Sequence, residues 1–242
     1  MNRLDKYLKN NSNSLVREEL FNYRLFYDLK KAAAEREYHL KIFAATVDFE
    51  GYDIIIDDGT KIGRYQIKTR FEARTPSWNI HRGMLLPRKF NADIMNYDNG
   101  LCNQNDSGVI LIDIKSNQER DIEYSLEYYY TDYYIIKAIA KKLIKRNKVT
   151  VNKANQILEK LILTKNLNTK ISISKGLFVK VKNPSCLLAI CGFDSKENIH
   201  IHHSLMKLFE RNKINLTQIE SNSNFSNYKN AFLHDIKKLI VQ

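Results

Sequence analysis

The feature that most constrains the fold is a hairpin pattern in the first third of the chain. Two runs rich in β-branched and aromatic residues, 52–57 and 61–70, flank the turn pair Asp58-Gly59. Asp and Gly tolerate the positive φ angles that tight hairpin turns require. The pattern therefore predicts two antiparallel strands with their turn at this pair.

Three polar side chains of this hairpin are expected to converge. Side chains alternate faces along a strand, so Gln66 and Lys68 share one face, and Asp53 on the first strand can lie beside them. Metal-assisted hydrolysis of a phosphodiester needs hard oxygen ligands, an activated water and a charge that offsets the phosphate. The candidate metal ligands are Asp53, the side-chain oxygen of Gln66 and the backbone carbonyl of Ile67. Lys68 is the candidate group that orients the water, and the expected ion is Mg²⁺, with Mn²⁺ as the alternative.

At these residues the chain resembles the PD-(D/E)XK nuclease superfamily, which has the restriction endonuclease-like fold. The superfamily pattern is a helix, a strand, an Asp at a second strand, an acid-x-Lys element on a third strand, and then a helix and a strand. Asp53 matches the first acid, and residues 66–68 match the acid-x-Lys element. Tyr52 stands where the name-giving Pro would be, and Gln66 replaces the acid, as in some similar restriction enzymes. The resemblance covers roughly residues 14–148.

Gln66 removes one negative charge from the expected metal site, so another carboxylate is needed to restore affinity. Glu18 is the preferred helper, because members of the superfamily often carry a glutamate on the first helix. A helix is expected over residues 15–37, with an apolar stripe that includes Phe21, and Glu18 lies three residues before it. The alternative helpers are Glu37, Glu50 and Asp58.

The net charge of +12 is concentrated in one segment. Residues 137–182 hold 13 Lys and Arg residues and one acid, Glu159, whereas the rest of the chain has 26 basic and 26 acidic residues. Local basicity of this kind favours double-stranded DNA or another polyanion, although a solvated lysine face is the alternative. Arg70 is a further candidate because it lies on the face of Gln66 and Lys68. The candidate DNA contacts are Arg70, Trp78, Arg82, Lys141, Lys142, Lys145, Arg146 and Lys175.

The expected fold class is α/β (α+β), in two regions. Residues 1–148 form a restriction endonuclease-like core, with a central mixed sheet flanked by helices, in which 109–114 is a buried strand. Residues 149–242 form a basic α/β extension that binds DNA, as a winged-helix-like module, or completes the core or a dimer. Within this extension the sequence predicts a helix over 151–163, a hairpin over 170–182 and a strand over 186–193.

Cysteine usage and hydropathy narrow the class of protein. The three cysteines (Cys102, Cys186 and Cys191) are odd in number and lack zinc-ligand spacing, which favours a reduced, cytoplasmic protein. The first residues begin no signal peptide, and no apolar run approaches the ~20 residues of a membrane span, so no membrane partner is expected.

These observations predict a Mg²⁺-dependent DNA endonuclease, a hydrolase of phosphodiester bonds. The resemblance further suggests a restriction or anti-phage defence role. Because cutting both strands needs two sites, a homodimer is expected. Two alternatives remain: a non-catalytic nucleic-acid-binding module on a degenerate nuclease fold, and a nuclease for branched DNA or RNA.

Overall fold

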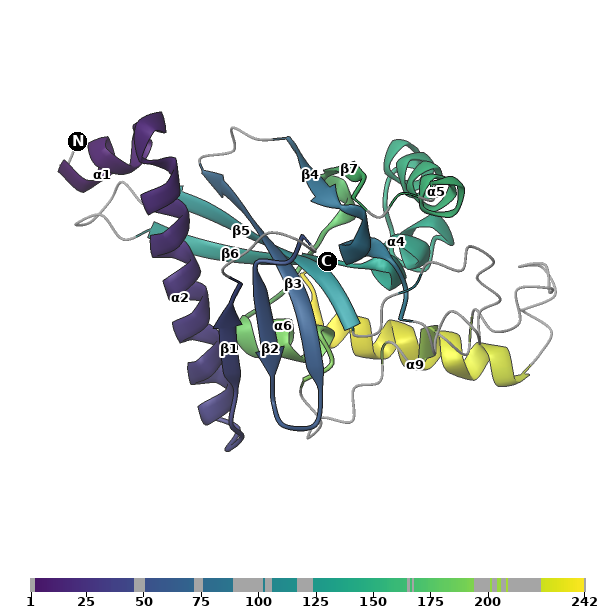
Figure 1. The fold of residues 1–242 in the computed structure, drawn as a ribbon. Coiled ribbons are helices and arrows are strands. Elements are labelled where there is room, and N and C mark those ends of the chain that lie inside the picture. Colours follow the sequence, from purple (N-terminus) through teal and green to yellow (C-terminus); the bar gives the residue numbers. More distant parts are fainter. Residues whose placement is uncertain are drawn as a thin grey trace.

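The computed structural model describes most of the chain (Figure 1). The described residues are 3–45, 51–71, 76–88, 102, 106–116, 124–164, 166, 168–193, 201, 204–205, 208 and 223–241. Within them the fold is mixed α+β.

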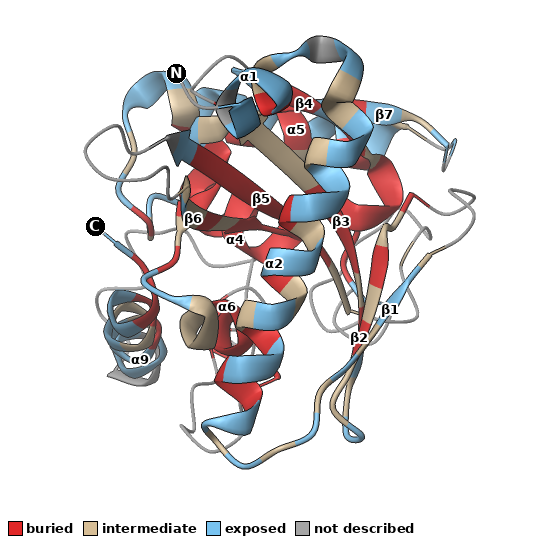
Figure 2. Cartoon of the chain, turned by 90° about the vertical axis from the view of Figure 1, so that its left-hand side faces the viewer, coloured by how far each residue is buried: buried red, intermediate tan, exposed pale blue. Residues whose placement is uncertain are grey.

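The first long helix forms as the apolar periodicity predicts. A short helix α1 (Arg3–Lys9) and a 3₁₀ turn η1 (Asn11–Asn13) lead into α2 (Ser14–Ala34). The buried side chains of α2 recur every three or four residues and are Phe21, Leu25, Leu29, Ala32 and Ala33. Figure 2 views the chain with α2 in front of the sheet, and exposed positions run along the side of the helix that faces the viewer.

The predicted hairpin is confirmed. Strands β2 (Ile54–Asp57) and β3 (Ile62–Phe71) pair antiparallel, and β1 (Lys41–Ala44) pairs with the outer edge of β2. In the turn, Gly59 has φ +86°, the left-handed conformation that favours glycine. The Asp58 carboxylate accepts the backbone N–H groups of the two residues after Gly59, at 2.9 and 2.8 Å.

Six strands form the main sheet within the described residues. Its order is β1-β2-β3-β5-β6-β8, and it adds β5 (Asp106–Ser116), β6 (Tyr124–Thr131) and β8 (Val179–Lys180) to the hairpin. Only the β3–β5 pair is parallel, so the sheet is mixed, as expected. The expected buried strand 109–114 lies inside β5, and its apolar side chains are fully buried because the sheet is covered on both faces.

A second, two-stranded sheet lies beside two helices (Figure 1). It consists of β4 (Ser77–His81) and β7 (Lys170–Ser174), which pair antiparallel. The 3₁₀ turn η2 (Arg82–Leu85) follows β4, and η3 (Lys175–Leu177) follows β7. The helices are α4 (Tyr133–Ala140) and α5 (Lys148–Leu163).

Two predictions for the C-terminal region are wrong. Residues 170–182 do not form a hairpin, because β7 pairs with β4 whereas β8 joins the edge of the main sheet. Residues 186–193 do not form a strand, because most of them belong to helix α6 (Pro184–Ile190). The side chain of Asn183 caps this helix by accepting the backbone N–H of Cys186 at 2.8 Å, and Pro184 occupies its first turn.

The two predicted regions share both sheets. Residues 149–242 supply β7 to the small sheet and β8 to the main sheet, and their helix α6 packs against α2. The last helix, α9 (Ser223–Leu239), packs against α6. The predicted boundary after residue 148 therefore separates segments that build one hydrophobic core. No helix in the described ranges is long and apolar enough to cross a membrane.

Two glycines with positive φ give a matched test of this architecture. Gly51 has φ +76°, and a Cβ there would lie 2.1 Å from Cγ of His81, whereas Gly59 has open space around it. We expect Gly59→Ala to cost about 1 kcal/mol of backbone strain, and Gly51→Ala to cost at least about 2 kcal/mol more because His81 must move. Urea denaturation measures both; equal losses for the two variants would contradict the close contact between Gly51 and His81.

Candidate functional site

The candidate site lies where the pairing between β2 and β3 stops, at the N-terminal end of β2. The two strands pair from Ile54 opposite Tyr65 to Asp57 opposite Ile62. Beyond Tyr65, residues 66–71 of β3 pair with β5 alone, among the strands that the structure describes. The other edge of β3 is therefore open over these residues.

Two side chains occupy hydrogen-bonding groups of this open edge. Asp53, directly before β2, accepts the Ile67 N–H through Oδ2 at 2.6 Å. Trp78, on β4, donates its indole N–H to the carbonyl oxygen of Thr69 at 3.2 Å. The N–H and C=O of one residue point to the same side of a strand, so the Ile67 carbonyl also faces the open edge.

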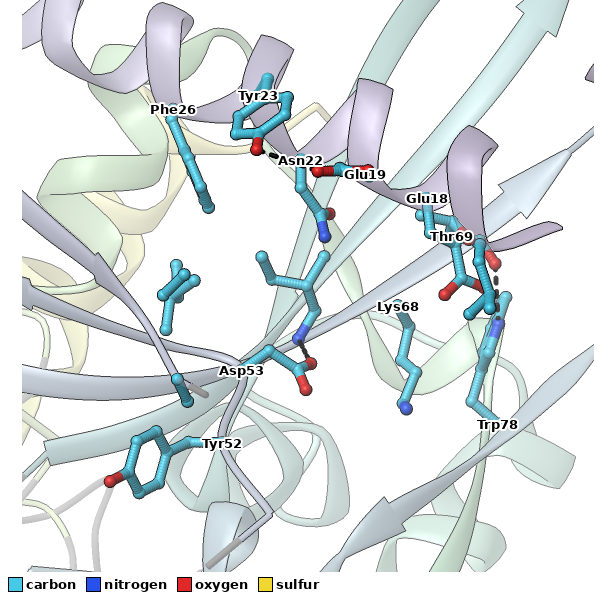
Figure 3. A pocket seen from close by; sticks show the side chains of 15 residues that line it. Glu18, Glu19, Asn22, Tyr23, Phe26, Tyr52, Asp53, Lys68, Thr69 and Trp78 are labelled. Carbon is cyan, nitrogen blue, oxygen red and sulfur yellow. Dashed lines mark hydrogen bonds between the residues drawn. The ribbon is translucent and has the colours of Figure 1, made fainter. Parts of the chain in front are cut away.

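A pocket of about 700 Å³ follows the open edge between β3 and the first half of α2. Figure 3 shows Glu18 above it on α2, Asp53 directly before β2, and the Lys68 side chain between them in this view. Ile67 and Trp78 complete this part of the lining. The structure thus brings five sequence-selected residues together at the pocket: Glu18, Asp53, Ile67, Lys68 and Trp78. Glu18 is exposed at the rim of the pocket, not turned into the core stripe as the helix pattern predicted.

Gln66 lies apart from these residues. Only 6% of its surface is exposed, and it does not line the pocket. Its side-chain oxygen accepts the backbone N–H of His81 at 3.1 Å, which ties β3 to the end of β4. Gln66 therefore acts in this structure as a link between two strands.

His81 is a residue that sequence reasoning missed. Besides its bond to Gln66, its ring nitrogen Nδ1 accepts the N–H of Gly83 at 3.2 Å, and its ring lies against Gly51. These contacts join β4, η2 and the residues just before β2. The only local signal was the Gly83 two positions later, because the other partners are distant in sequence.

The donor set of the pocket fits Mg²⁺. Three carboxylates line the pocket, Glu18, Glu19 and Asp53, and Glu19 accepts the Tyr23 hydroxyl at 3.0 Å. Glu18, Asp53 and the Ile67 carbonyl are hard oxygen donors, and Mg²⁺ is commonly held by one or two carboxylates with several waters. No group of three or more His, Cys, Asp or Glu side chains in the described residues is arranged to hold a metal. Such a group is more typical of zinc sites than of magnesium sites. Of the alternative helpers, Glu37 and Asp58 do not line the pocket, and Glu50 lies outside the described residues.

Arg70 and Lys175, two candidate DNA contacts, meet at a buried acid. The Asp113 side chain is only 3% exposed and forms ion pairs with Lys175 and, at 3.6 Å, with Arg70. The Lys175 ammonium also lies 4.4 Å from the centre of the Tyr129 ring. This cluster joins β3, β5, β6 and η3. Because Asp113 pairs with both Arg70 and Lys175, part of the positive charge of these two side chains is already compensated inside the fold.

Arg82 is fully buried, which corrects its interpretation as a surface contact to DNA, whereas Trp78 is largely buried but lines the pocket. Arg82 has no exposed surface and donates a hydrogen bond to the Leu161 carbonyl in the last turn of α5. Trp78 is 8% exposed and packs edge-on against Phe178 at 5.7 Å. We therefore interpret both as residues that fix β4 to the core.

The remaining candidate DNA contacts surround the turn between α4 and α5. Lys141, Lys142 and Lys145 are exposed there. Arg146 is half-buried, and its guanidinium donates to the carbonyl oxygens of Gly176 and Phe178, each at 3.1 Å. Arg146 thus joins this basic corner to the segment that follows β7.

Comparison with models of protein families, with curated proteins and with solved structures finds no match to this chain. Its function must therefore be argued from its own residues.

A second carboxylate near the Asp113 cluster makes stability depend on pH. Burial alone raises the pKa of Glu127, but hydrogen bonds from Lys115, Lys180 and Tyr129 outweigh this effect and lower the pKa to about 2. In the unfolded chain the pKa of a glutamate is near 4.3, so ionised Glu127 stabilises the fold above that pH. This contribution is lost as the pH falls from the unfolded pKa towards the folded one.

We therefore expect the free energy of unfolding to decrease between about pH 4.5 and pH 2, and Glu127→Gln to flatten this decrease. Urea denaturation at a series of pH values measures the slope. Glu159→Gln, at an exposed position on α5, is the control and should keep the wild-type slope. Parallel pH profiles for wild type and Glu127→Gln would contradict the prediction.

Proposed function

We propose that this protein is a Mg²⁺-dependent DNA endonuclease. The observation that carries the proposal is the pocket at the open edge of β3, where Glu18, Asp53 and Lys68 surround one space. The carboxylates of Glu18 and Asp53 beside the Lys68 ammonium can serve both a divalent ion and a phosphodiester. An ordinary solvated hairpin gives no reason for Asp53 and Lys68 to face a carboxylate of α2 across one pocket.

Four residues of the pocket have roles that suit phosphodiester hydrolysis. Asp53 and Glu18 would hold the ion together with the Ile67 carbonyl. The bound ion would supply charge to the phosphate and lower the pKa of a coordinated water. Lys68 is suited to orient the attacking water and to offset negative charge as the bond to the leaving oxygen breaks. The hydrogen bond from Ile67 N–H keeps the Asp53 carboxylate turned to the strand edge.

The order of elements supports a restriction endonuclease-like core. Helix α2 is followed by the antiparallel strands β1, β2 and β3, and then by β5, which is parallel to β3. This order agrees with the superfamily pattern up to the third strand. Between β3 and β5 the described residues contain β4 and η2 in place of the expected helix, and residues 89–101 lie outside the description.

A second candidate function is a nucleic-acid-binding module that does not cut. The position of Gln66 favours it, because the residue that replaces the second acid is buried and already accepts the His81 N–H. On this alternative, Asp53 serves only to complete the edge of β3, and the basic corner at α4 and α5 binds the nucleic acid.

Plasmid cleavage in Mg²⁺ separates the two functions. We expect wild type to nick or linearise supercoiled DNA, and Asp53→Asn and Lys68→Ala each to reduce the rate by about 100-fold or more. Asparagine can still accept the Ile67 N–H, so Asp53→Asn removes the charge while keeping the strand contact. Glu159→Gln is the exposed control and should cut like wild type.

Two outcomes would count against this assignment. If wild type binds DNA but cuts in neither Mg²⁺ nor Mn²⁺, the enzyme proposal fails and the binding module is favoured. If cleavage persists in both pocket variants while their thermal unfolding is unchanged, hydrolysis takes place elsewhere.

A homodimer would supply the two sites that cutting both strands requires, and α2 offers a surface for it. Half of the large apolar side chains exposed in the described residues lie on α1 and α2. Four of them follow one helical stripe opposite the core and are 46–61% exposed: Val16, Leu20, Tyr23 and Tyr27. A continuous apolar stripe on a surface helix is typical of an interface. We propose that two copies pair through this stripe.

Light scattering tests the dimer. We expect wild type to have twice the chain mass of 28.4 kDa, and the double variant L20E/Y27E to have the mass of one chain. Neither residue lines the pocket. Ile162→Glu, which introduces the same change at an exposed apolar position of α5, should leave the mass unchanged. A wild type that stays monomeric at all concentrations, or a double variant that stays dimeric, contradicts this surface.

A further inference from the structure

The small sheet has one apolar face and one polar face. Burial alternates along both strands, and the inward side chains are Trp78, Ile80, Ile171 and Ile173. The outward positions form cross-strand pairs: Ser77 with Ser174, Asn79 with Ser172, and His81 with Lys170. We call β4 and β7 together the ribbon.

The ribbon is held rigidly. A two-stranded sheet is marginal by itself, but the apolar face of this one is buried against the core. Ile80 and Ile173 have no exposed surface, and Trp78 is tied both to Thr69 and to Phe178. Directly after β4, Arg82 bonds to the end of α5. The outward side chains therefore stand on a fixed backbone.

The polar face has an unusual composition. It presents an amide, three hydroxyls and an ammonium, and none of its described positions is an acid. Exposed edge strands are commonly protected by charged side chains, especially Lys, which oppose pairing with another chain. Asn79 and Ser172, paired at the centre, are both exposed and make no side-chain hydrogen bond within the described residues. His81 differs, because its ring is engaged by Gly83 and Gly51.

We propose that the ribbon enters the major groove of duplex DNA and reads base edges, with Asn79 and Ser172 at the centre of the contact. This inference rests on the proposed function in so far as DNA is the partner. The major groove is about 12 Å wide and admits a two-stranded ribbon, whose strands are about 4.8 Å apart. An Asn side chain can bond bidentately to adenine, and a Ser hydroxyl can bond to any base.

The spacing of the outward side chains also suits the groove. Alternate residues of a strand are about 6.8 Å apart, which equals about two base-pair steps of 3.4 Å. Ser77 and Asn79 on one strand, with Ser172 and Ser174 on the other, would thus span a few base pairs. Uncharged donors and acceptors carry sequence information, whereas charges to phosphate mainly set position.

The surroundings of the ribbon supply charge for the phosphates. β7 lies inside the basic segment 137–182, and Lys170 is exposed at one end of the ribbon. At the other end, Arg146 bonds to the carbonyl oxygens of Gly176 and Phe178, and so brings the basic corner between α4 and α5 close to the ribbon. The ribbon therefore has uncharged side chains at its centre and basic side chains beyond both of its ends.

Selection from a randomised duplex pool tests this inference separately from cleavage, because binding is measured in EDTA. The variants are wild type, the double variant N79A/S172A, and the matched control S226A/N227A at exposed positions of α9. We expect wild type and the control to enrich the same short sequence. The ribbon variant should lose at least about tenfold of the preference at one or two base pairs, and should keep the salt dependence of its binding. Unchanged thermal unfolding checks that the exposed substitutions leave the fold intact.

The outcomes distinguish this inference from the proposed function. Sequence-selective binding that depends on Asn79 and Ser172, without cleavage in Mg²⁺ or Mn²⁺, supports the ribbon and removes the nuclease. Cleavage with no sequence preference in the bound pool overturns the ribbon and leaves the nuclease in place. An affinity loss that is equal for all sequences also overturns it, because that pattern indicates phosphate contacts. Failure of wild type to bind duplex DNA overturns both.

Discussion

The hydrogen bond from Ile67 N–H to the Asp53 carboxylate marks the point on which the arrangement of the site depends. Up to Tyr65, the edge of β3 is paired with the backbone of β2. One pair of residues later, a side chain takes the place of that backbone. An open strand edge exposes unsatisfied N–H and C=O groups, so each must find a partner in a side chain, a ligand or water. The pocket exists because the pairing of β2 with β3 stops at Tyr65, and the group that replaces it is only the short Asp53 side chain.

This origin gives Asp53 two functions that compete in interpretation. A carboxylate that terminates a strand pair is useful to the fold whether or not it binds a metal. The same hydrogen bond also orients the carboxylate, and oriented ligands bind metals better than mobile ones. A variant that keeps the acceptor and removes the charge is therefore more informative than truncation, since only the metal-binding function requires the charge.

Local patterns predicted the parts of the fold that local physics determines. The hairpin follows from Asp58-Gly59 and the alternation around it, and the buried stripe of α2 follows from the spacing of its apolar residues. The strand predicted over 186–193 was wrong although a local signal existed, because the capping pair Asn183-Pro184 outweighs the β-propensity of the apolar run.

Other features had no local signal. The alternation in 170–182 is real, but whether two strands pair with each other depends on the alternative partners, and β4 and β6 lie far away in sequence. The candidate site was likewise predictable only in part. Asp53, Lys68 and Glu18 could be selected from a pattern and a resemblance. The burial of Arg82 and the bond between Gln66 and His81 depend on long-range packing.

That long-range bond explains why an uncharged amide can occupy position 66. A glutamate there would place a charge under β4, where burial penalises it unless a cation or a metal compensates. The Gln66 amide instead accepts one backbone N–H without a charge, and its cost of burial is small. Gln66 thus acts as a clamp between β3 and β4. Since β4 also carries Trp78 into the pocket and Asn79 onto the polar face of the ribbon, the clamp fixes the pocket and the ribbon relative to each other. If the pocket holds a metal as proposed, Gln66 adds no ligand to it and instead couples the pocket to the ribbon.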